Sequence, residues 1–144
     1  MISPTSSSPS LEHSVVGGKY RVLQMIGSGG MGTVWSGVHV TLGTPVAIKF
    51  IRPQYASMED ARQRFEIEAL AAAKLTTIHA VKVFDYGVTD DGLPYIVMEY
   101  LQGESLSEAL IKQGPMPPHE VAQIIGQAAL ALSKAHAAGA AKGP

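Results

Sequence analysis

The sequence contains no cysteine among its 144 residues. Disulfide bonds, thiolate metal sites and cysteine nucleophiles are therefore excluded. Charge is also sparse, because Asp, Glu, Lys and Arg together make up 16% of the chain and the net charge is −1. That balance gives no general attraction to nucleic acid or to anionic lipid. Five histidines, at positions 13, 39, 79, 119 and 136, lack the spacing of metal ligands, so we expect no metal site.

Long uninterrupted apolar runs are missing as well. The most apolar stretch, residues 121–141, is interrupted by polar and charged residues: Gln123, Gln127, Ser133, Lys134 and His136. A buried helix explains this stretch better than a membrane span. Residues 1–18 are predicted as a disordered leader, because their first ten are rich in Ser and Pro and lack the features of a secretory signal. We therefore expect a cytoplasmic protein, and its length favours one domain.

The periodicity of apolar residues predicts an α+β fold. Alternating or β-branched segments predict five strands, at residues 19–26, 33–40, 45–51, 81–86 and 93–98. A change of period over 57–74 predicts a helix between the third and fourth strands, and Ser57 can cap its start. A short helix is expected over 104–113. A long helix follows from about 117 to 138, and Gly139 ends it.

The most specific motif is a glycine-rich loop with a lysine behind it. Residues 26–34 read Ile-Gly-Ser-Gly-Gly-Met-Gly-Thr-Val, and Lys49 lies within the apolar segment Val46-Ala47-Ile48-Lys49. A dinucleotide-binding fold fits poorly, because this loop leads into strand residues and no acidic residue follows about 20 positions later. A Walker-type loop also fails, since no Gly-Lys-Ser/Thr follows the glycines. A plain hairpin remains an alternative, but it gives no reason for the buried lysine.

The chemistry of these residues suits a nucleotide. Glycine lets the backbone approach phosphates closely. A lysine on a largely buried strand is costly without partners, and a phosphate together with a carboxylate would supply them. Glu68, on the predicted 57–74 helix, is the preferred carboxylate, because Phe65-x-x-Glu68-Ala69 resembles the regulatory-helix pattern of protein kinases. Glu66 is the rival, but it lies two residues away and therefore on another face of that helix.

These motifs, with the segment from Pro94 to Leu106 (PYIVMEYLQGESL), resemble the ATP-binding lobe and hinge of bacterial Ser/Thr protein kinases. The resemblance runs from about Lys19 to Gly139. It implies an N-lobe over 19–101, with a five-stranded antiparallel sheet and one long helix. The hinge exit and the first two C-lobe helices would then occupy 102–144.

The resemblance also assigns roles to individual residues. Lys49 and Glu68 would form the pair that orients the α- and β-phosphates of ATP. Met98 would be the gatekeeper, and Glu99 and Leu101 would hydrogen-bond adenine through their backbones. The full set of implied ATP contacts is Ile26, Gly27, Ser28, Gly29, Gly30, Met31, Gly32, Thr33, Val34, Ala47, Lys49, Met98, Glu99 and Leu101.

The agreement with the family stops after Gly139. The family would continue with two apolar residues and H-R-D-x-K-P, whereas this chain reads Ala-Ala-Lys-Gly-Pro over 140–144. The catalytic-loop Asp and the Asn and Asp that hold Mg²⁺ are therefore absent from the sequence. We therefore expect a truncated kinase domain that is inactive as a lone chain and binds ATP weakly. Mg²⁺ would be bound only through ATP, because its protein ligands are missing.

Two other readings stay open. A non-catalytic nucleotide-binding or interaction module could dock on a protein partner through the 121–138 helix. That helix is apolar around most of its circumference, which predicts an exposed apolar patch. An enzyme of another fold with a nucleotide cofactor comes third, because only the glycine-rich loop favours it.

Overall fold

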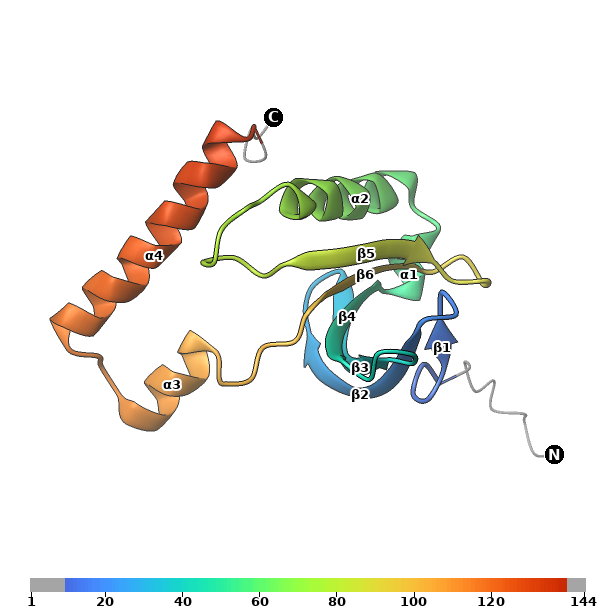
Figure 1. The fold of residues 1–144 in the computed structure, drawn as a ribbon, viewed down its shortest axis with the longest axis horizontal. Coiled ribbons are helices and arrows are strands. Elements are labelled where there is room, and N and C mark those ends of the chain that lie inside the picture. The colour runs from blue at the N-terminus through green and yellow to red at the C-terminus, as the bar shows by residue number, and fades with distance from the viewer. Residues whose placement is uncertain (1–9, 140–144) are drawn as a thin grey trace.

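The computed structural model describes residues 10–139, and its core is a six-stranded antiparallel sheet in the order β1-β2-β3-β4-β6-β5 (Figure 1). The strands are β1 (Val15–Val16), β2 (Tyr20–Ser28), β3 (Gly32–His39), β4 (Pro45–Ile51), β5 (Val83–Val88) and β6 (Pro94–Glu99). The predicted α+β fold with an antiparallel sheet is confirmed. The expected number of five strands is wrong, because β1 adds a sixth strand beside β2.

The strand β1 also corrects the predicted leader. Residues 1–18 were expected to be disordered, yet Val16 pairs with Tyr20 and is buried. The His13 N–H also donates to the Val22 carbonyl at 2.8 Å. Ordered structure therefore begins before residue 18. Residues 1–9 of the predicted leader lie outside the described residues.

Four helices accompany the sheet: α1 (Pro53–Ala56), α2 (Glu59–Ala73), α3 (Leu106–Gln113) and α4 (Pro118–Ala137). Helix α2 buries Ala61, Phe65 and Ala69, which are spaced four residues apart and so form one face of the helix. The predicted cap at Ser57 is wrong. Ser57 closes the short helix α1, and Met58 occupies the N-cap position of α2 without a side-chain hydrogen bond.

Strand β4 is the best-buried element of the sheet. It lies between β3 and β6, and Ile48, Phe50 and Ile51 have no exposed surface. Neighbouring β3 approaches closely at Gly37, where an added Cβ would lie 2.7 Å from the Arg21 carbonyl oxygen and 2.8 Å from Ile48 Cδ1. Only glycine fits there. Tight packing on both sides therefore fixes the strand that carries Lys49.

Helices α3 and α4 follow β6. Helix α3 starts in a capping box, in which Ser105 and Glu108 each accept the other's backbone N–H. Helix α4 stands apart from the sheet, beyond the C-terminal end of α2 (Figure 1). Its large apolar side chains are 37–62% exposed: Val121, Ile124, Ile125, Leu130 and Leu132. The expected exposed apolar surface is thus present. No helix among residues 10–139 is both long and apolar enough to cross a membrane.

Candidate nucleotide-binding site

The glycine-rich segment forms the turn between β2 and β3. The Gly29 N–H donates to the Gly32 carbonyl at 2.9 Å, which closes the turn. A Cβ on Gly32 would lie 2.7 Å from the Phe50 carbonyl oxygen, so glycine is required where β3 passes β4. At Gly29 and Gly30, an added Cβ would have no neighbour within 4 Å. The tip of the turn is therefore open space, into which a ligand can approach the backbone.

Lys49 projects from the centre of β4, where it is paired with Val34 on β3 and Ile96 on β6. Its Nζ donates to Glu68 Oε1 at 2.9 Å. The Lys49 side chain is 29% exposed and that of Glu68 is 57% exposed. An ammonium group has three donors. The pair therefore holds Lys49 in place and leaves the ammonium able to donate to a further acceptor.

Glu66, the rival carboxylate, lies near Tyr86. Burial of the phenol raises the pKa of Tyr86, and the nearby Glu66 carboxylate raises it further. Glu66 is exposed on α2 and has no ion pair with Lys49. Of the two candidates, Glu68 is thus the one in contact with the lysine.

A cavity of about 370 Å³ adjoins the Lys49–Glu68 pair. Its wall is otherwise apolar and includes Val34, Ala69, Leu75, Val83, Ile96 and Met98. An apolar hollow with a few placed polar groups is the usual form of a small-molecule site. The sequence did not identify the part of this wall that α2 and β5 contribute. The apolar residues along these elements were the only signal for it.

The structure brings only some of the predicted residues to this cavity. Val34, Lys49, Glu68 and Met98 line it. The other eleven predicted residues lie outside its lining: residues 26–33, Ala47, Glu99 and Leu101.

These outer residues differ in their surroundings. Ile26 is 46% exposed on β2, and Leu101 is 62% exposed after the end of β6. Ala47 is buried on β4 opposite Met98. The Glu99 N–H donates to the Lys82 carbonyl at 2.9 Å, which ties the end of β6 to the start of β5.

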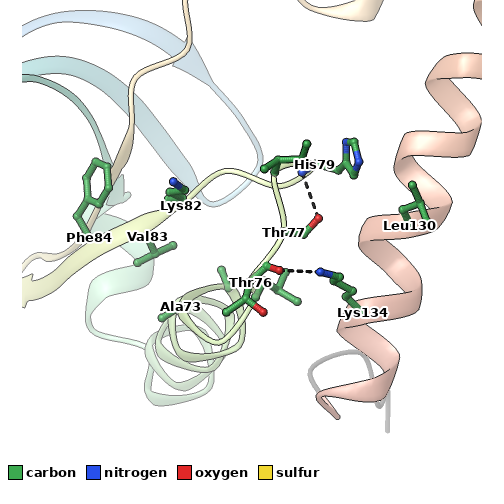
Figure 2. A pocket seen from close by; sticks show the side chains of 12 residues that line it. Ala73, Thr76, Thr77, His79, Lys82, Val83, Phe84, Leu130 and Lys134 are labelled. Carbon is green, nitrogen blue, oxygen red and sulfur yellow. Dashed lines mark hydrogen bonds between the residues drawn. The ribbon is translucent and has the colours of Figure 1, made fainter.

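A second, larger hollow of about 730 Å³ lies between the segment that follows α2 and helix α4 (Figure 2). Lys134 on α4 crosses one side of it and donates from Nζ to the Thr76 carbonyl at 3.0 Å. His79 and Lys82 add basic groups, and none of the lining residues among 10–139 carries a carboxylate. The smaller cavity is the candidate for the predicted nucleotide, because of these two hollows it is the one lined by Lys49 and by a residue of the glycine-rich segment.

Metal-binding groups are not clustered in the described part of the chain. Within residues 10–139, no three His, Cys, Asp or Glu side chains are arranged to hold a metal ion. The site consists of an open glycine turn, a lysine paired with a glutamate and an apolar cavity. This donor set fits a phosphorylated ligand with a flat apolar part.

A glycine turn above a strand lysine that pairs with a helix glutamate characterises the ATP-binding lobe of a kinase. The chain belongs to the protein kinase family, since the family model for the protein kinase domain matches residues 20–141. Among similar proteins, the Ser/Thr-protein kinase PknL of Mycobacterium tuberculosis is 41% identical over 129 residues, or 90% of this chain and 32% of PknL. The Bacillus subtilis Ser/Thr-protein kinase PrkC is 38% identical over 84% of this chain and 18% of PrkC.

The fold is also similar to a solved kinase domain. The crystal structure of the M. tuberculosis PknI kinase domain gives a TM-score of 0.77 at 32% identity. The match covers 90% of this chain and 52% of that one. The predicted resemblance to bacterial Ser/Thr protein kinases is therefore confirmed. This chain spans about half of the matched kinase domain and about a third of PknL.

Proposed function

We propose that residues 19–101 bind ATP in the cytoplasm and that they serve phosphoryl transfer to Ser or Thr of protein substrates within a complete kinase domain. The observation that carries this proposal is the 2.9 Å contact between Lys49 and Glu68 beside the apolar cavity. The open tip of the glycine turn, on the neighbouring strands, adds support. Family membership supplies the reaction class.

Each part of the site would meet a different part of ATP. The backbone at Gly30, at the tip of the turn, would face the phosphates, because an added Cβ there has no neighbour within 4 Å, whereas the Gly29 N–H is already bonded to the Gly32 carbonyl. Lys49 would donate to the α- and β-phosphate oxygens while Glu68 holds it in place. Met98, Glu99 and Leu101, at the end of β6, would meet the adenine. Mg²⁺ would reach this chain only through the phosphates of ATP.

The 144 residues contain no H-R-D or D-F-G motif. The family places its substrate-orienting Asp and its Mg²⁺ ligands in those motifs. We therefore propose that this chain, assayed by itself, binds ATP weakly and transfers no phosphate.

A competition titration tests ATP binding. A fluorescent ATP analogue would be titrated with the purified chain and then displaced with unlabelled ATP, with inorganic phosphate as the control. Saturable binding that ATP reverses supports the proposal. The absence of any displaceable binding up to about 1 mM contradicts it. Incorporation of labelled phosphate into a protein substrate by the chain alone would overturn the proposed inactivity.

A second function is favoured by the exposed face of α4. Ile125, Leu130 and Leu132 are each more than half exposed, which is unusual for three large apolar residues on one helix. The chain could thus act as a non-catalytic module that docks on a protein through the 121–138 helix. Light scattering of freshly purified protein distinguishes the readings. A complex of defined stoichiometry supports the module, whereas monomer or polydisperse aggregate contradicts it.

A further inference from the structure

Arg52 contacts the glycine-rich turn through both its backbone and its side chain. It follows the last residue of β4, and its N–H donates to the Met31 carbonyl at 2.8 Å. Its guanidinium Nη2 donates to Ser28 Oγ at 2.6 Å and to the Gly29 carbonyl at 3.0 Å. The Nε of the same group lies 3.3 Å from the Gly29 carbonyl. One residue therefore binds the turn at three positions: Ser28, Gly29 and Met31.

The position of Arg52 makes these contacts informative. Arg52 lies three residues beyond Lys49, and the buried Phe50 and Ile51 between them hold this part of the chain rigid. Besides Arg52, the hydrogen bond from the Gly29 N–H to the Gly32 carbonyl closes the turn. Gly29 and Gly30 are exposed, and no other side chain donates to their carbonyls in the described part of the structure. A glycine-rich segment loses more conformational freedom on ordering than any other sequence.

We propose that Arg52 is a positioning residue for the glycine-rich turn. Its guanidinium fixes the tip relative to Lys49, so that the turn and the lysine meet the phosphates of a nucleotide as one preorganised unit. The inference rests on the proposed ATP binding, and it names a residue outside the predicted ATP contacts. Arg52 acts through the turn and does not itself touch the nucleotide.

The geometry requires arginine in particular. The planar guanidinium offers several N–H donors in a fixed fork, and here it serves Ser28 Oγ and the Gly29 carbonyl together. A lysine would keep the charge but present a single flexible ammonium. Charge-assisted hydrogen bonds of this kind are about twice as strong as neutral ones. Losing them should therefore free the tip without unfolding the sheet, since Arg52 lies outside β4 and, among residues 10–139, its side chain hydrogen-bonds only to the turn.

The test compares four variants of the chain: Arg52→Met, Arg52→Lys, Ser28→Ala and the control Arg21→Met. Arg21 is exposed on β2, and its side chain makes no hydrogen bond among the described residues. Backbone ¹⁵N order parameters of Gly29, Gly30 and Met31 are measured without nucleotide. The affinity for a fluorescent ATP analogue and the thermal unfolding midpoint are measured on the same samples.

In the parent chain, we expect order parameters near the rigid value of about 0.85 at the tip. Arg52→Met should lower them below about 0.6 and weaken binding of the analogue about tenfold, because ordering even one freed residue costs that much. Arg52→Lys and Ser28→Ala should give intermediate values. Arg21→Met should match the parent. If Arg52→Met does not fold, Ser28→Ala still removes one acceptor of the guanidinium, and its order parameters carry the test, because Ser28 is itself among the implied ATP contacts.

Several results would overturn the proposal. One is low order parameters at the tip of the parent chain, and another is order parameters that Arg52→Met leaves unchanged. Parent-like order parameters and affinity in Arg52→Lys would also overturn it, because charge alone would then suffice. A loosened tip with unchanged affinity would also overturn it. If the parent chain binds no ATP analogue at all, the proposed function fails. The order parameters then still report whether Arg52 holds the turn.

Discussion

Replacing Lys49 by Met separates the contribution of the lysine to stability from its contribution to ATP binding. Met keeps an unbranched chain of similar length and removes the ammonium. The Lys49–Glu68 pair is partly exposed, at 29% and 57%, so it should add only about 0–1 kcal/mol to the free energy of unfolding. For a chain of this size, that change lowers Tm by at most about 4 °C.

The effect on binding should be much larger. A hydrogen bond to a charged group contributes about 1.5–3 kcal/mol, and each 1.4 kcal/mol is tenfold in affinity. Lys49→Met should therefore weaken ATP binding by about 10- to 100-fold. The lysine has no other hydrogen-bonded partner than Glu68 among residues 10–139, so no second contact should mask the loss.

The assay is a titration with a fluorescent ATP analogue, together with thermal unfolding of the same sample. Lys74→Met is the matched control, because Lys74 is exposed at the end of α2 and does not line the cavity. We expect the control to bind as the parent does. Equal affinity of Lys49→Met and the parent would refute the assignment of Lys49. A collapse of Tm would refute the statement that the pair contributes little to stability.

Three further predictions concern the fold and the surface. Gly37→Ala should lower the free energy of unfolding in urea by about 1–3 kcal/mol through overpacking, whereas Gly30→Ala, in open space, should change it by less than about 0.5 kcal/mol; equal losses would contradict the packing. Burial, followed by the Asp85 contact, raises the pKa of Tyr20 to about 12. The protonated phenol should therefore contribute fully to the free energy of unfolding below pH 10. That contribution should be lost towards pH 12, by no more than about 1.4 kcal/mol per pH unit. Urea unfolding from pH 9 to 12 should therefore show a smaller loss in Tyr20→Phe than in the parent, and identical pH profiles would contradict the assignment. The double variant Ile125→Glu with Leu132→Glu should reduce self-association in light scattering and leave the free energy of unfolding unchanged. Undiminished self-association would mean that another surface mediates it.

The sequence predicted the main strands because their apolar patterns are strong. Strand β4 reads as an apolar run with one lysine, and the structure buries its neighbours fully. Strand β1 was missed, because a two-residue strand carries no periodic signal. The start of α2 was misplaced for a related reason. Pro53 opens a short helix that uses Ser57 at its end, so the best local capping residue belongs to a different helix.

Within the site, spacing along the chain was informative only where a regular element fixed the geometry. Lys49 stood out as a charge within an apolar strand, whereas Glu68 was matched to it through the resemblance of its helix to the pattern of protein kinases. The contact between Arg52 and Ser28 joins residues 24 apart across a turn. That contact depends on how the hairpin curls over the end of β4, which no periodicity encodes. The apolar cavity wall likewise depends on how α2 lies against β5.

The most direct test of the central claim is a titration of ¹⁵N-labelled chain with ATP, followed by the backbone amide signals. The account predicts progressive shifts at residues 27–32, at Lys49 and at residues 98–101, with Glu68 affected through its contact with the lysine. Shifts confined to the hollow between residues 72–84 and α4 would contradict it, because that hollow contains neither the glycine turn nor Lys49. A spectrum unchanged at about 1 mM ATP would contradict it as well.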